Sequence, residues 1–80
     1  MITSSQIRAG RALLKWTGAD LAEKSGVAFS TIMRMETADG VPNGTLKTIE
    51  AIKKAFEEAG IEFIGTPELG AGVRWRIKSQ

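Results

Sequence analysis

The sequence predicts a mainly α-helical domain in which four helices are followed by a β-hairpin. Two observations support this prediction. Before Gly60, apolar residues recur at helical spacing, and several of these segments begin at a threonine that can cap a helix. After Gly60 the spacing changes to alternation in two short stretches, which is typical of strands. A chain of 80 residues has room for one domain and not two.

The first two helices are predicted from their caps. Thr3 and Gln6 stand three residues apart, as in a capping box, and open a helix that we expect to run to about residue 15. Thr17 and Asp20 repeat this arrangement at the start of a second helix. Gly26 follows where a left-handed residue would end that helix.

A third, short helix is expected over residues 28–36, and it begins without a capping hydroxyl because its first residue is Ala28. The loss of a cap typically costs about 1 kcal/mol. After a loop-like stretch, Thr45 caps a fourth helix that ends at Gly60. The apolar residues at helical spacing in this fourth helix are Leu46, Ile49, Ile52 and Phe56.

The last 20 residues have the pattern of a β-hairpin, with the turn-rich stretch TPELGAG between two alternating segments. An isolated hairpin is marginal in water. The apolar residues of this hairpin are Ile61, Phe63, Val73, Trp75 and Ile77. We expect part of this apolar face to cover the fourth helix and the rest to form a dimer interface with a second copy of the chain.

Composition and charge exclude several classes of function. The chain contains no histidine and no cysteine, which argues against zinc sites, histidine acid–base catalysis and disulfides. Glu57 and Glu58 are adjacent on an exposed helix face, and catalytic carboxylates would need to converge in a pocket, so we expect no enzyme and no cofactor. No signal peptide or membrane-spanning apolar run is present, so we expect a cytoplasmic location. A net charge of +2 permits a polyanionic partner without requiring one.

The residues around Gly26 have the pattern of a helix-turn-helix. Ala22 is small enough for a helix crossing, and Val27 and Ile32 can fix the second helix on the first. The segment WTGADLAEKSGVAFSTIMRME, with QIRAGRALLKW before it, resembles the helix-turn-helix of the Cro and phage-repressor family of Xre-type regulators. The resemblance covers about residues 5–56. It implies a four-helix λ-repressor-like domain that regulates transcription, and we expect a repressor.

The resemblance implies that the helix 28–36 enters the major groove of double-stranded DNA with its N-terminal end first. It assigns base reading to Phe29, Ser30 and Arg34. A phenylalanine can pack on a thymine methyl, a serine can bond several base edges, and an arginine can hold a guanine through two hydrogen bonds. The alternatives are that Phe29 packs against a neighbouring loop and that Arg34 is a solvated charge.

Phosphate contacts are expected on both sides of this helix. At the start of the second helix, Thr17 and Gly18 offer backbone amides at the positive end of a helix dipole. Family members usually have glutamine at position 18, so here only the backbone and the Thr17 hydroxyl are left for a phosphate. Around the start of the fourth helix the candidates are Asn43, Thr45 and Lys47. A turn role for Asn43 and a capping role for Thr45 explain these two residues equally well.

Two further expectations concern the frame around the site. In the family, an arginine of the first helix pairs with the glutamate that closes the third, which implies a structural ion pair between Arg11 and Glu36. One recognition helix reads few base pairs, so we also expect a homodimer that reads half-sites about 34 Å apart. Residues 1–60 would form the DNA-binding domain, and residues 61–80 the dimerisation element of the same domain.

The main alternative is an antitoxin-like protein. Its tail would bind a toxin-like protein partner, and its helix-turn-helix would regulate its own operon. Such a chain usually carries a separate partner-binding segment, and here only the last 20 residues are available for one. Co-purification with a stoichiometric protein would favour the antitoxin, whereas a free homodimer that binds operator DNA would favour the simple regulator.

Overall fold

Four α-helices and one antiparallel β-hairpin make up the computed structural model, which describes residues 2–38 and 44–76. The helices are α1 (Ser4–Leu14), α2 (Gly18–Ser25), α3 (Phe29–Thr37) and α4 (Leu46–Glu58), and the strands are β1 (Ile61–Ile64) and β2 (Gly72–Trp75). The prediction of a mainly helical domain with a C-terminal hairpin is confirmed. In the part of the chain that the structure describes, no helix has the length and apolar character needed to cross a membrane.

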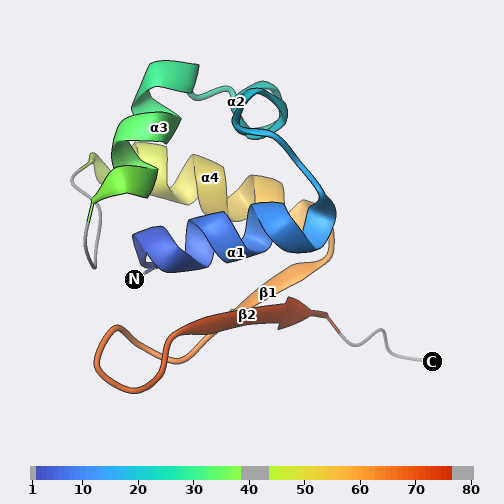
Figure 1. Cartoon of the computed structure of the whole chain (residues 1–80), viewed down its shortest axis with the longest axis vertical. Coiled ribbons are helices and arrows are strands. Elements are labelled where there is room, and N and C mark those ends of the chain that lie inside the picture. Colours follow the sequence, from blue (N-terminus) through green and yellow to red (C-terminus); the bar gives the residue numbers. More distant parts are fainter. Residues whose placement is uncertain (1, 39–43, 77–80) are drawn as a thin grey trace.

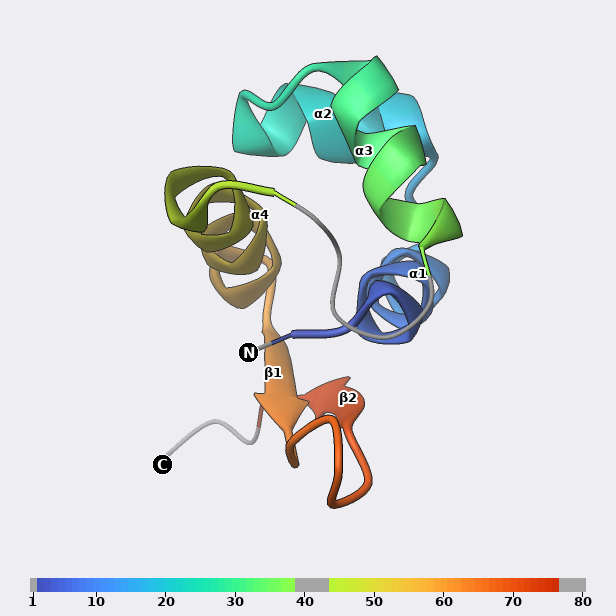
Figure 2. The same cartoon turned by 90° about the vertical axis from the view of Figure 1, so that its left-hand side faces the viewer.

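The elements are arranged in layers (Figures 1 and 2). α1 and α4 form the middle layer, α2 and α3 cover one side of it, and the hairpin lies on the other side. The strands pair so that Ile61 lies opposite Trp75 and Phe63 lies opposite Val73. The middle layer therefore separates the hairpin from α2 and α3.

The ends of the first two helices follow the local signals of the sequence. Thr3 and Gln6 form a complete capping box at the start of α1, and Thr17 and Asp20 form another at the start of α2. Gly26 ends α2 in the left-handed conformation, with a φ of 74°. Because these signals depend on neighbouring residues alone, they can be recognised without knowledge of the tertiary structure.

The third and fourth helices also begin as the sequence predicts. Ala28 precedes α3 without a side-chain hydrogen bond. Thr45 precedes α4, and its hydroxyl accepts the Thr48 amide at 3.1 Å. The N-terminal end of α3 must therefore be held by contacts other than a cap.

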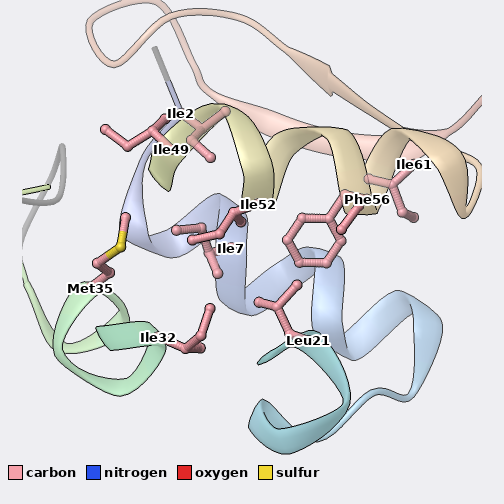
Figure 3. Packing of buried hydrophobic residues seen from close by; sticks show 10 residues of the cluster. Ile2, Ile7, Leu21, Ile32, Met35, Ile49, Ile52, Phe56 and Ile61 are labelled. Atoms are coloured by element: carbon pink, nitrogen blue, oxygen red, sulfur yellow. The ribbon is translucent and has the colours of Figure 1, made fainter. Parts of the chain in front are cut away.

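One apolar core joins the layers (Figure 3). Its fully buried side chains come from the four helices and from β1, and include Ile7, Leu21, Ile32, Phe56 and Ile61. The Phe56 ring stacks on Trp16 and meets Phe63 edge-on, with both pairs of ring centroids 5.7 Å apart. A Cβ at Gly10 would lie 3.0 Å from Phe56, so the glycine allows the ring to pack directly on α1.

Part of the hairpin belongs to this core, which confirms the expectation that part of its apolar face covers the fourth helix. Ile61 is fully buried within the chain, and Phe63 and Val73 pack against the buried cluster. Of the residues expected at a dimer interface, Trp75 is 50% exposed. Ile77 lies outside the described residues. The chain's own helices thus cover Ile61, Phe63 and Val73, and the dimer interface expected for the rest of this face stays a prediction.

The side chain of Gln6 connects the start of α1 to both strands. Its Oε1 accepts the Thr3 amide at 2.7 Å, as the capping box requires. Its Nε2 donates to the carbonyl oxygens of Ile64, at 3.2 Å, and Gly72, at 2.8 Å. Ile64 and Gly72 pair with each other across the hairpin. A single side chain, 3% exposed, therefore holds both strands against α1.

We expect Gln6→Glu to loosen the hairpin while leaving the α1 cap in place. A glutamate can still accept the Thr3 amide, but it has no hydrogen to donate to Ile64 and Gly72. Two partly buried carbonyls then lose the hydrogen bond from Gln6, and the free energy of unfolding should fall by about 1–3 kcal/mol. Urea denaturation measures this loss. Hydrogen exchange should show that the substitution accelerates the exchange of the hairpin amides more than that of the amides in α2 and α3.

Thr3→Val is the matched control for Gln6→Glu. It removes the hydroxyl that accepts the Gln6 backbone amide, and it retains the side-chain amide of Gln6 that bonds to the hairpin. This control should destabilise the start of α1 and leave the hairpin amides protected. Equal hairpin protection in Gln6→Glu and the wild type would contradict the role given to Gln6.

Candidate nucleic-acid interface

α3 turns one face to the core and the other to solvent. Ile32 and Met35 are buried and anchor its inner face. Phe29, Ser30 and Arg34, the residues expected to read bases, are all exposed, and the exposed fraction of Phe29 is 52%. Ser30 and Arg34 lie four residues apart and therefore on the same side of the helix. α3 thus presents an aromatic ring, a hydroxyl and a guanidinium to solvent.

The guanidinium of Arg34 has no hydrogen bond or ion pair within residues 2–38 and 44–76. The arginines at positions 8, 11 and 74 each bond to another residue of the chain. Arg34 also differs from them in position, because it lies on α3 itself. Arg34 is thus exposed, and its guanidinium has no partner among the described residues.

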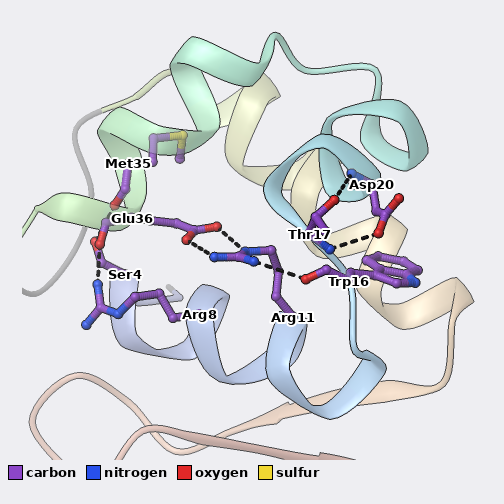
Figure 4. Close-up of polar contacts among 8 residues, drawn as sticks. All are labelled: Ser4, Arg8, Arg11, Trp16, Thr17, Asp20, Met35 and Glu36. Carbon is purple, nitrogen blue, oxygen red and sulfur yellow. Dashed lines mark hydrogen bonds and ion pairs between the residues drawn. The ribbon is translucent and has the colours of Figure 1, made fainter.

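An ion pair between α1 and α3 fixes the C-terminal half of α3 (Figure 4). Arg11 donates to both carboxylate oxygens of Glu36, with distances of 2.7 Å from Nε and 2.6 Å from Nη2. Glu36 is 5% exposed, and its hydrogen bond with Arg11 raises the pKa of the guanidinium above its ordinary value. Arg11 also donates to the Trp16 carbonyl at 3.0 Å. The expected pair is present, and it joins α1, α3 and the segment before α2.

Two more side chains of α1 satisfy carbonyl groups at the end of α3. The Ser4 hydroxyl donates to the Met35 carbonyl at 2.6 Å, and Arg8 donates to the Glu36 carbonyl (Figure 4). The last turn of a helix leaves its carbonyls without helical partners. Ala38, which follows α3, is extended and provides no left-handed cap. Donors from α1 therefore take the place of a C-terminal cap.

We expect Glu36→Ala to destabilise the protein by about 3–5 kcal/mol, because it leaves the partly buried Arg11 charge without its partner. The double variant Arg11→Met/Glu36→Leu removes both charges and should recover a large part of that loss. Urea denaturation of the two variants tests this. A single-variant cost below about 1 kcal/mol, as for an exposed pair, would show that the pair does not fix α3.

The N-terminus of α2 is a poorer phosphate site than the sequence suggests. The Thr17 amide donates to the Asp20 carboxylate at 2.8 Å, and Gly18 is buried, so neither expected amide is open to a phosphate. Asp20 already places a negative charge at this helix end, and the hydrogen bond from the Thr17 backbone lowers its pKa. A phosphate here would be repelled by Asp20. The Thr17 hydroxyl and the exposed residue Ala19 are the contacts that remain.

The start of α4 lies beside the turn between α2 and α3. A depression of 360 Å³ between them is lined by residues that include Gly26, Ala28, Thr31, Lys47 and Thr48. Lys47 is exposed at this depression, close to the N-terminal end of α3. Thr45 is exposed as well, although its hydroxyl caps α4. Asn43 lies outside the described residues. Lys47 is thus the phosphate candidate that the geometry places best.

The sequence did not reveal the side chains that hold the site in position. Ser4, Arg8 and the amide hydrogens of Gln6 bond to backbone carbonyls, which every residue carries, so no residue pattern marks their partners. Met33 packs over α2. Its spacing of four residues from Phe29 is the feature of the sequence that could have indicated that the two side chains lie together. Among the described residues, no cluster of acidic side chains could hold a metal ion.

Neither the models of known protein families nor the curated proteins give a match to this sequence.

Proposed function

We propose that the chain is a sequence-specific regulator of transcription that binds double-stranded DNA, has a λ-repressor-like helix-turn-helix fold, and acts as a repressor in the cytoplasm. In this proposal α3 enters the major groove with its N-terminal end first. The observation that carries the proposal is the outer face of α3. Phe29, Ser30 and Arg34 are exposed on a helix whose inner face and C-terminal end are fixed.

The rigid attachment of α3 supports base reading. Hydrogen bonds to base edges demand a defined position of the side chains, and a helix that is already ordered loses little conformational entropy on binding. The distribution of charge on and near α3 also supports DNA binding. Glu36, the acidic residue of α3, is neutralised by Arg11, whereas Arg34 and Lys47 face solvent. A polyanion that approaches α3 therefore meets cationic side chains without an opposing carboxylate on that helix.

The antitoxin-like alternative receives less support from the fold. It needs a segment that is free to bind a protein partner, and the sequence leaves the hairpin for that role. Ile61 of the hairpin is fully buried, and Gln6 bonds to both strands. The regulator proposal needs only the part of the hairpin that is exposed, at Trp75, for its homodimer.

Selection of DNA by the purified protein tests the proposal. The protein is incubated with a library of random duplexes, and the bound duplexes are sequenced after successive rounds. We expect a two-fold symmetric site with half-sites about one helical turn apart, and an affinity that falls steeply as salt is raised. Binding without sequence preference, or no binding at low salt, would contradict the proposal.

We expect Arg34→Ala to cost about 1–3 kcal/mol on the selected duplex and to relax the preference at one base pair. Arg76→Ala is the matched control, because it removes an equal charge just after β2, and the hairpin lies across the middle layer from α3. The control should leave base preference unchanged. If Arg34→Ala weakens binding equally on all sequences, Arg34 contacts a phosphate and not a base.

The proposal includes a homodimer, for which Trp75 is the best-placed hairpin residue. It is 50% exposed beside the last described residue of the chain. We expect Trp75→Thr to shift sedimentation from dimer to monomer and to reduce affinity for the symmetric duplex more than for random DNA. Leu69→Thr is the control, because Leu69 is 79% exposed in the loop between the strands. If Trp75→Thr still sediments as a dimer, the dimer interface does not depend on Trp75 and lies elsewhere.

A further inference from the structure

Two side chains of α3 cover Gly18, the first residue of α2. Gly18 is buried despite its place at a helix end. A Cβ at Gly18 would lie 3.0 Å from Phe29 Cε1 and 3.6 Å from Met33 Sδ, and it would overlap the Met33 methyl group. Phe29 and Met33 are four residues apart, so both extend from one stripe of α3. The bare backbone at Gly18 is therefore the surface on which both side chains pack.

The backbone conformation at Gly18 does not require a glycine. Gly18 is helical, and its φ is not among the positive φ values of the described chain. In helix interiors, glycine is less favourable than alanine by about 1 kcal/mol. An alanine would suit the backbone better, but its Cβ would displace the Met33 methyl group and press on the Phe29 ring, so the two side chains would have to shift. The glycine thus allows α3 to bring these two side chains against the N-terminus of α2.

The contact with Gly18 restricts the Phe29 ring. One edge of the ring rests on α2, while 52% of the residue remains exposed on the outer face of α3. A contact between an aromatic ring and one thymine methyl is small, so it discriminates between bases when the ring is already in place. Met33 contributes by filling the space beside the ring over Gly18.

We propose that Gly18 and Met33 are positioning residues that hold Phe29 so that its exposed side recognises the methyl group of one thymine. This inference rests on the proposed DNA-binding function. It adds the two residues that set the position of the Phe29 ring against this methyl group. Gly18 itself contacts no base, because it is buried beneath the side chains that it positions.

The first test uses the free protein. The labelled ε-methyl group of Met33 should show a ring-current shift in its NMR resonance, because the methyl and the Phe29 ring adjoin the same point above Gly18. Phe29→Leu should abolish that shift, and Gly18→Ala should change it. Gly72→Ala is the control, since its added Cβ would meet Ile64 at an ordinary 3.6 Å in the hairpin. An unchanged Met33 resonance in both Phe29→Leu and Gly18→Ala would overturn the inference.

The second test replaces each thymine of the selected duplex in turn by uracil, which lacks the C5-methyl group. At one position in each half-site, we expect the wild type to bind the uracil duplex about fourfold more weakly, as for the loss of one buried methyl contact. Phe29→Ala should lose this discrimination. Gly18→Ala and Met33→Ala should each reduce it below about twofold, while binding to random DNA persists.

A double variant distinguishes positioning from general damage. In Gly18→Ala/Met33→Ala, the added methyl group occupies space that the shorter side chain has vacated, so discrimination should exceed that of either single variant. Full thymine discrimination in Gly18→Ala, or a flat uracil scan in the wild type, would overturn the inference while leaving sequence-specific binding intact. Failure of the wild type to select any duplex would instead overturn the proposed function.

Discussion

The last turn of α3 is held by side chains of α1, and the orientation of the whole outer surface follows from this attachment. Arg11 bonds to both oxygens of the buried Glu36 carboxylate, which fixes the helix in rotation as well as in position. Ser4 and Arg8 donate hydrogen bonds to carbonyls of the last turn, which have no partner within the helix. A buried pair of this kind contributes more to defining one arrangement than to net stability. These polar contacts and the buried Ile32 and Met35 together determine which face of α3 meets solvent.

The two ends of α3 are held by different forces. The C-terminal end depends on charge and hydrogen bonds, whereas the N-terminal end has no side-chain cap at Ala28 and rests on apolar contacts with α2 at Gly18. The outer face between them is free for the groove contacts that we propose. Gly18 and Ala28 thus affect the same end of the helix, and the packing of Phe29 and Met33 over Gly18 holds this end in place of a cap.

Helix boundaries could be predicted because their signals are local. Thr3, Thr17 and Thr45 cap the helices that follow them, as their sequence neighbours indicate. The candidate site was harder to predict from the sequence, because the exposure of a residue depends on others that are far apart in sequence. Gly18 offered an open amide in the sequence but is covered by a helix that begins 11 residues later. Likewise, the pattern around Ile61 predicts an apolar face without showing whether helices of the same chain or another copy will cover it.

Gln6 has a consequence for synthesis of the chain on the ribosome. Its two carbonyl partners lie 58 and 66 residues further along the sequence. The helices can assemble from nearby contacts, whereas this bond set must wait until nearly all of the described chain has emerged. Until then, the side of α1 and α4 that Ile61 and Phe63 will cover stays in water. Between the completion of α4 and that of the hairpin, the nascent protein therefore exposes an apolar face opposite α3, which a chaperone that binds apolar segments could cover.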